Sequence, residues 1–140
     1  MENIKTVGVA FIKEGKLLIV QSVRSAQTHS WTLIGGGVET NETPEQAACR
    51  EVAEEIGNGF TISETDLAPI LGFKQEAASD ENIMIEMHVY LCQKAIDVEL
   101  VPNKEILAFH WYSLGEIERN LSSSITENII PYGIENNLLY

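Results

Sequence analysis

The sequence is short of basic residues. Lysine and arginine together number nine, against 21 aspartates and glutamates, so the formal net charge is −12 at pH 7. A surface of this sign repels DNA and RNA, so we exclude long nucleic acid as a partner. A small phosphorylated ligand remains compatible with the charge, because a bound divalent cation can reverse the local field of an acidic site.

Cysteine, proline and long apolar runs are also scarce. The chain has two cysteines and four prolines. Cys49 and Cys92 lie in separate apolar segments, which argues against a disulfide framework and indicates free thiols in a reducing compartment. The amino-terminal residues lead into a short strand pattern, without the apolar stretch of a signal peptide or membrane span. We therefore expect a cytoplasmic protein with no membrane association, either a monomer or a homodimer.

The length and composition suit one folded domain. With 140 residues and 44% apolar side chains, the chain can bury a single hydrophobic core, and we expect one domain over residues 1–140. Runs of β-forming residues, several with an apolar residue at every second position, indicate strands. These runs predict a hairpin of 6–12 and 16–21 around Lys13-Glu14-Gly15, and further strands at 70–74, 83–92 and 108–112.

Two capping boxes predict the starts of helices. In the first, Thr43 is the cap, Gln46 completes the box and Gly57 marks the end of the helix. The second, formed by a serine and a glutamate three residues later, predicts a short helix over Leu114–Arg119. The tail from 122 to 140 has no clear periodicity and stays ambiguous.

The first predicted helix carries a cluster of glutamates on one face. At about 100° per residue, Glu51, Glu54 and Glu55 fall within an arc of roughly 100°. A glutamate pair alone is usually part of an ordinary solvated face. Three like charges so close destabilise an isolated helix, however, so a bound cation is the simplest compensation. Oxygen ligands favour Mg²⁺ or Mn²⁺.

The spacing around these glutamates matches a known motif. Gly36 is followed after five residues by Glu42, and after seven more by Arg50-Glu51-Val52-Ala53-Glu54-Glu55-Ile56-Gly57. This pattern matches the Nudix box, and the chain resembles the Nudix hydrolase family. The segment Glu42–Ala47 is most similar to the MutT-like branch. The sequence departs from the usual pattern at three positions, Ile34, Asn41 and Asn58.

The resemblance implies both a fold and an activity. The fold is α/β, a Nudix-type α/β/α sandwich in which a mixed sheet lies between the box helix and a carboxy-terminal helical segment. The activity is Mg²⁺-dependent hydrolysis of the diphosphate linkage of a nucleoside diphosphate compound. The match over 42–47 favours a (deoxy)nucleoside triphosphate, so a small nucleotide is the expected partner.

The resemblance also implies roles for individual residues. Glu51, Glu54 and Glu55 would hold the cation together with the Gly35 carbonyl, and Glu51 would act as the general base. Two further residues form a catalytic scaffold, because Arg50 would pair with Glu42 and hold the glycine loop against the helix. Glu105 resembles an additional metal ligand from a late loop, although an exposed loop carboxylate is an equally good interpretation.

Three residues outside the box are candidates for substrate binding. Arg24 could contact a phosphate or a base, but a solvated loop arginine is the more common case. Trp31 and Phe73 could stack on a base, and core packing explains them equally well.

Two alternatives to the triphosphate hydrolase remain open. One is a Nudix-fold regulator that binds a nucleotide without cleaving it, although no box glutamate is missing. The other is a pyrophosphatase that acts on nucleotide sugars or dinucleoside polyphosphates. Residues that select the base lie outside the box, so the motif alone does not choose among these substrates.

Overall fold

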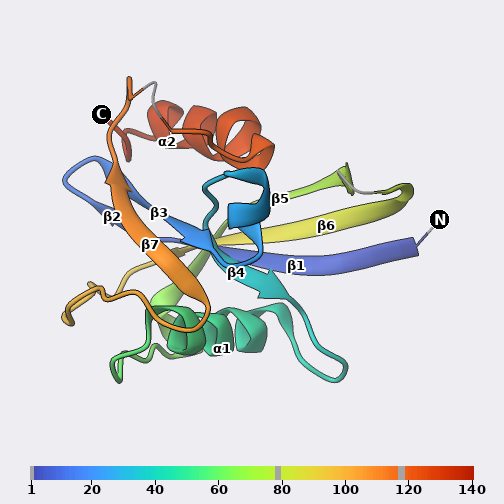
Figure 1. Ribbon diagram of the computed structural model, residues 1–140, viewed down its shortest axis with the longest axis horizontal. Coiled ribbons are helices and arrows are strands. Elements are labelled where there is room, and N and C mark those ends of the chain that lie inside the picture. The colour runs from blue at the N-terminus through green and yellow to red at the C-terminus, as the bar shows by residue number, and fades with distance from the viewer. Residues whose placement is uncertain (1, 78–79, 117–118) are drawn as a thin grey trace.

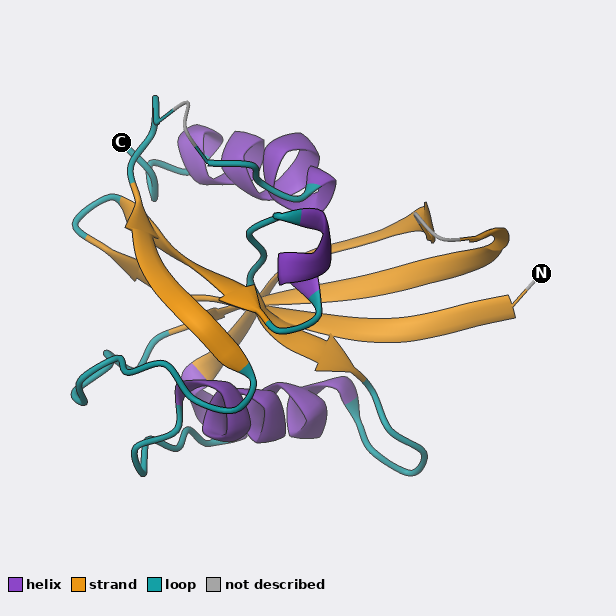
Figure 2. Ribbon diagram, viewed as in Figure 1, coloured by secondary structure: helices purple, strands orange, loops and turns teal. Residues whose placement is uncertain are grey.

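The computed structural model describes residues 2–77, 80–116 and 119–140. Within these ranges two β-sheets lie between helix α1 (Pro44–Ile56) on one side and helix α2 (Ile130–Glu135) on the other (Figures 1 and 2). The expected α/β/α sandwich is therefore confirmed. No helix in the described part of the chain is long and apolar enough to cross a membrane.

The larger sheet is mixed, as the resemblance implies. Its strand order is β4-β1-β6-β5, where β1 and β6 run parallel and the other neighbours run antiparallel. The smaller sheet has the order β2-β3-β7 and is antiparallel throughout. The strand bounds are Glu2–Ala10 (β1), Ile12–Lys13 (β2), Lys16–Ser22 (β3), Ile34–Gly37 (β4), Leu67–Ala77 (β5), Asp80–Cys92 (β6) and Ile106–Tyr112 (β7).

The predicted strands are confirmed, with some shifts in their bounds. The hairpin forms as β2 and β3, but the first run divides at Phe11, so that β1 belongs to the larger sheet and β2 to the smaller one. Strand β5 extends several residues beyond the predicted 70–74 on both sides. Backbone pairing with β6 extends from Leu67 to Ala77, with irregularities at Pro69–Leu71 and Glu76–Ala77, and holds residues that have little strand preference of their own.

Two hydrophobic clusters fill the spaces on either side of the strands. On the α1 side, Val52 and Ile56 pack with Val9, and on the α2 side, Ile125 and Ala10 belong to the second cluster. Successive side chains of a strand point to opposite faces, so neighbours in β1 contribute to different clusters. Ile34, the first residue of β4, also belongs to the first cluster, so the core holds α1 against the strand that carries the glycine run.

One predicted helix is wrong in the part that the structure describes. Leu114 and Gly115 form a turn and residue 119 is a bend, while residues 117–118 of the predicted Leu114–Arg119 helix lie outside the described residues. The Glu116 carboxylate does accept a hydrogen bond from Ser113 N at 2.9 Å. His110 Nε2 lies 2.8 Å from the same carboxylate and holds it at the end of β7. The Ser113–Glu116 hydrogen bond therefore closes a turn here instead of starting a helix.

The ambiguous tail is helical. A π-helical turn over Ile125–Ile129 continues directly into α2. Ile125, Ile129 and Leu139 are buried in the second cluster, and Tyr140 N donates to Gly15 O at 3.3 Å near the β2–β3 turn. Tertiary packing, rather than local preference, explains helix formation in this segment.

Candidate functional site

Helix α1 begins and ends where its sequence predicts. The Thr43 hydroxyl accepts a hydrogen bond from Gln46 N at 3.1 Å, and the Gln46 side chain accepts one from Thr43 N at 3.0 Å. Gly57 follows the last turn with φ of 63° and ψ of −156°, a backbone conformation open mainly to glycine. The buried apolar residues Ala48, Val52 and Ile56 fix the rotation of the helix between these ends, and with it the face that the glutamates occupy.

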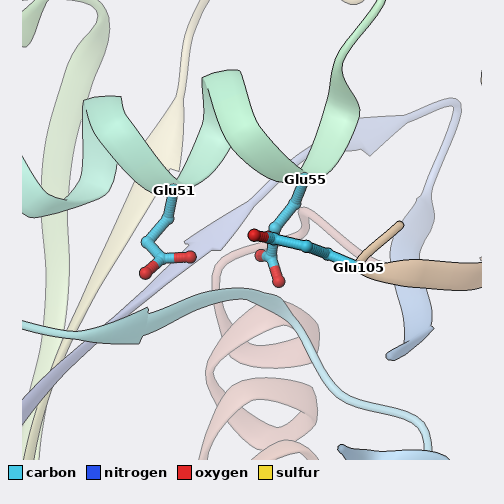
Figure 3. Close-up of side chains that lie close together, drawn as sticks. All are labelled: Glu51, Glu55 and Glu105. Atoms are coloured by element: carbon cyan, nitrogen blue, oxygen red, sulfur yellow. The ribbon is translucent and has the colours of Figure 1, made fainter. Parts of the chain in front are cut away.

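Three glutamates meet between α1 and the loop that precedes β7. Carboxylate oxygens of Glu51, Glu55 and Glu105 all lie within 4.8 Å of one another. Glu51 and Glu55 point from α1 towards β4, and Glu105 reaches in from the start of β7 (Figure 3). Among the described residues, these side chains therefore form a group that could hold a cation.

The glycine run provides close contact with this group. Gly35 N donates a hydrogen bond of 2.7 Å to Glu55 Oε1. At Gly36, an added Cβ would lie 2.5 Å from Glu51 Oε1, so any side chain there would displace the carboxylate. At Gly35, an added Cβ would collide with the backbone carbonyl of Val7. The strand can lie directly beneath the glutamates only because these positions are glycine.

Arg50 joins the glycine segment to the helix. Its Nε and Nη2 donate to the two oxygens of Glu42 at 2.8 and 3.0 Å, and Nη2 also donates to Gly37 O at 2.9 Å. Its Nη1 donates to Glu51 Oε1 at 2.9 Å. The structure thus contains the predicted Arg50–Glu42 pair, which is bidentate, and connects it to one of the grouped glutamates.

Two predicted metal ligands, Glu54 and Glu105, are more exposed than Glu51 and Glu55. The structure does not include Glu54 in the three-carboxylate group; its side chain is 43% exposed and its Oε2 lies 3.4 Å from Arg50 Nη1. Glu105 is exposed, yet the fold brings its carboxylate to the buried pair. The roles of both residues in metal binding stay predictions.

Burial makes the charges of this group unfavourable. Burial, together with repulsion from Glu51, Glu105 and Glu54, raises the pKa of Glu55 to about 8, although the Gly35 hydrogen bond opposes the rise. Burial likewise raises the pKa of Glu51, against the lowering effect of Arg50. In contrast, the hydrogen bonds from Arg50 and Glu39 N lower the pKa of Glu42 to about 2. The Glu42 carboxylate is therefore stably ionised, whereas ionisation of Glu51 and Glu55 calls for an additional positive charge nearby.

The donor set fits a small divalent cation. Three carboxylates close together offer hard oxygen ligands, and the raised pKa of Glu55 reflects a negative charge that the protein itself leaves uncompensated. A cavity of about 440 Å³ lies elsewhere, beside Phe11, Lys94 and Trp111, and none of the grouped glutamates lines it. We assign the candidate site from the carboxylates, because they are the ligands that a hard cation needs and the residues lining the cavity include none.

The three residues predicted to bind substrate lie outside α1 and β4, the two elements that carry the box. Arg24 is exposed at the start of a short 3₁₀ turn over Ser25–Thr28. Trp31 is half-buried, and the guanidinium of Arg119 lies 5.0 Å from the centre of its ring. Phe73 packs partly buried in the second cluster. Trp31 and Phe73 therefore have packing roles, and any contact of these three residues with a nucleotide stays a prediction.

Two structural features of the site were not predicted from sequence. Asn41, where the family usually has glycine, adopts φ of 66°, a left-handed conformation that asparagine tolerates better than most residues. Asn103 hydrogen-bonds both to the end of α1 and to the backbone of the Glu105 loop. An asparagine two residues before Glu105 is the sequence signal, since asparagine often caps a turn through its own side chain.

Comparison with known proteins places this geometry in a family. The family model of the NUDIX domain matches residues 2–132. The chain is 37% identical over 65 residues to CTP pyrophosphohydrolase of Escherichia coli strain K12, which covers 46% of this chain and 48% of that protein. It is 45% identical over 55 residues to 8-oxo-dGTP diphosphatase of Proteus vulgaris, which covers 39% and 49%. The chain spans less than half the length of the curated relatives that it matches.

A solved structure agrees in fold. The MutT protein from Methanosarcina mazei Go1 superposes with a TM-score of 0.76 at 20% identity, covering 96% of each chain. At this identity the likeness concerns the fold alone. The match of the family model over residues 2–132, together with the box glutamates on one helix, shows that this chain belongs to the Nudix hydrolase family and is similar to its MutT-like members.

Proposed function

We propose that this protein is a Mg²⁺- or Mn²⁺-dependent hydrolase that cleaves the diphosphate linkage of a nucleoside diphosphate compound, with a (deoxy)nucleoside triphosphate as the substrate. The observation that carries the proposal is the group of Glu51, Glu55 and Glu105, whose carboxylate oxygens lie within 4.8 Å of one another. The names of the relatives, a CTP pyrophosphohydrolase and an 8-oxo-dGTP diphosphatase, support the substrate class.

The reaction is hydrolysis at phosphorus. A water oxygen bonds to one phosphorus of the diphosphate, the bond from that phosphorus to the bridging oxygen breaks, and two phosphorylated products leave. A divalent cation, when bound, supplies charge neutralisation at the phosphate oxygens and lowers the pKa of water. Glu51 accepts the proton of the attacking water.

The remaining residues of the site hold the carboxylates in place. Glu55 and Glu105 are ligands, with Glu54 and the Gly35 carbonyl as further ligands from the edge of the same site. Arg50 acts through its neighbours, because its bonds to Glu42, Gly37 O and Glu51 fix one end of the group. Loss of this pair would release the glycine segment and the base together.

The composition supports a proposed partner and a proposed compartment. Net charge of −12 disfavours long nucleic acid, and a small nucleotide bound with a cation is the partner that we propose. Cys49 and Cys92 are free thiols, which supports a reducing, cytoplasmic compartment.

A hydrolysis screen, in which chromatography resolves the phosphorylated products from the substrates, tests the proposed function. The protein is incubated with Mg²⁺ and a panel of nucleoside triphosphates, nucleotide sugars and dinucleoside polyphosphates, with Glu51→Gln as the control for contaminating enzymes. We expect turnover of a triphosphate that stops in excess chelator and returns with Mg²⁺ or Mn²⁺. Full turnover in chelator would contradict the cation mechanism. Tight binding of a nucleotide without turnover would instead support the non-catalytic regulator.

A further inference from the structure

The side chain of Asn103 connects the backbones of two candidate metal ligands. Its Nδ2 donates to Glu55 O at 2.8 Å, near the carboxy-terminal end of α1. Its Oδ1 accepts from Glu105 N at 2.9 Å and from Ile106 N at 3.0 Å. The amide orientation is unambiguous, because the carbonyl oxygen faces two N–H donors and the NH₂ group faces a carbonyl.

Glu105 needs such a restraint more than the other two glutamates. Glu51 and Glu55 are fixed by their helix, and Glu55 is only 7% exposed. Glu105 is exposed and lies in the bend just before β7. Three carboxylates within 4.8 Å repel one another, so an unrestrained loop glutamate would swing out into water.

The bonds of Asn103 act at the point where this movement would begin. Two of them hold the amides of Glu105 and of the first residue of β7, and Asn103 N also donates to Ile106 O at 2.9 Å. The third side-chain bond, from Asn103 Nδ2 to Glu55 O, attaches this turn to the helical residue whose own carboxylate belongs to the three-glutamate group. The position of the Glu105 carboxylate is therefore coupled to that of Glu55.

We propose that Asn103 is a positioning residue that keeps Glu105 within reach of the cation, and thereby sets the affinity of the site for divalent metal. The inference rests on the proposed function, since it assumes that the three glutamates bind a cation. Asn103 itself contacts no substrate. It acts through backbone amides, in the manner of residues that orient the ligands of a metal.

A second asparagine provides a matched control. Asn58 Nδ2 donates to Glu99 O at 3.3 Å, which joins the end of α1 to an earlier part of the same connecting segment. Its φ of 54° suits glycine, so Asn58→Gly removes the link without backbone strain. A general weakening of this segment would appear in both asparagine variants, whereas loss of Glu105 positioning would appear only at Asn103.

The experiment measures Mn²⁺ binding to the whole protein by the electron paramagnetic resonance signal of free Mn²⁺. Asn103→Ala and Glu105→Gln should each weaken binding by about tenfold or more, and Asn58→Gly should change it by less than about twofold. In the double variant the two losses should not add, because Asn103 acts through Glu105. Unchanged affinity in Asn103→Ala, or a full further loss in the Glu105→Gln background, would overturn the inference.

The controls separate the two levels of the hypothesis. If the unaltered protein binds no Mn²⁺ and hydrolyses no nucleotide, the proposed function fails and this inference fails with it. If it binds and hydrolyses but Asn103→Ala behaves identically, only the role of Asn103 is wrong. Should Asn103→Ala not fold, hydrogen exchange of the unaltered protein decides. The Glu105 and Ile106 amides must then exchange at least about tenfold slower than in an unstructured chain, and unprotected amides would refute their bonds to Asn103.

Discussion

Replacing Glu55 by glutamine should stabilise the metal-free protein at alkaline pH. The carboxyl group is 7% exposed, and its pKa is raised to about 8 from the ordinary 4.5. Because the folded protein holds this proton more tightly than the unfolded chain does, the contribution to stability is fully present below pH 4.5 and is lost as the pH rises to 8. Glutamine has nearly the same shape, can still accept the Gly35 hydrogen bond and carries no charge.

The size of the effect follows from the same values. At about 1.4 kcal/mol for each tenfold change in proton affinity, a rise in pKa from 4.5 to about 8 sets a ceiling of about 5 kcal/mol. Water entry and small shifts of the side chains lower this figure, so we expect glutamine to raise the free energy of unfolding by about 2–4 kcal/mol at pH 8.5. At pH 4.5 the two proteins should differ much less.

Urea unfolding at several pH values, in excess chelator, measures this difference. Glu54→Gln is the matched control, since the same change one residue earlier on a 43% exposed side chain should shift stability by less than about 1 kcal/mol. Added Mg²⁺ should reverse the order of the unaltered protein and Glu55→Gln, because only the carboxylate binds the cation. If the advantage of glutamine does not grow between pH 4.5 and 8.5, the carboxyl group ionises without penalty and the assignment of burial as its cause is wrong.

Three further predictions concern the residues around this carboxylate. Glu51→Gln should lower kcat by about 10² or more with little change in KM, and Glu45→Gln, on the same helix but outside the site, should not; equal losses in steady-state assays would point to a general charge effect. Glu42→Gln should lower the melting temperature, because it removes the bidentate partner of Arg50. Since the pKa of Glu42 is about 2, the stability that this carboxylate provides should be lost as the pH falls from 4.5 to 2, and acid titration followed by circular dichroism would show or refute this loss. Gly36→Ala should slow turnover by about 10² while calorimetry shows a nearly unchanged melting temperature, because its Cβ would meet the movable end of Glu51; a large loss of stability would mean that the strand itself cannot accept a side chain.

The parts of the fold with local signals could be predicted from the sequence. Thr43 and Gln46 form the expected capping box, so the predicted start of α1 was correct. The same signal failed at Glu116, whose carboxylate also contacts His110 of β7. A capping box is a local preference, and here the carboxylate instead contacts a histidine of the preceding strand and closes a turn.

The candidate site was predictable to a similar degree. The box spacing located Glu51 and Glu55, which share a helix, and family resemblance added Glu105 from a segment 50 residues later. No periodicity could show that Glu54 would turn towards Arg50 and leave the three-carboxylate group, or that Asn103 would connect the helix to the loop. Both outcomes depend on side-chain contacts across elements that meet only in the folded chain.

The electrostatics of the site also bear on how a nucleotide would arrive. Arg50 forms a salt bridge with Glu51, but its guanidinium also binds Glu42 and Gly37 O. In the described part of the chain, no salt bridge joins Glu55 or Glu105 to a cationic side chain. With a net charge of −12, the protein as a whole repels a free triphosphate. The same carboxylates attract a divalent cation, and a nucleotide that carries one presents a much reduced negative charge to the surface. The buried Glu55 carboxyl thus either holds a proton or, when ionised, calls for a cation, and in the proposed function that same cation would allow an acidic protein to accept an anionic substrate.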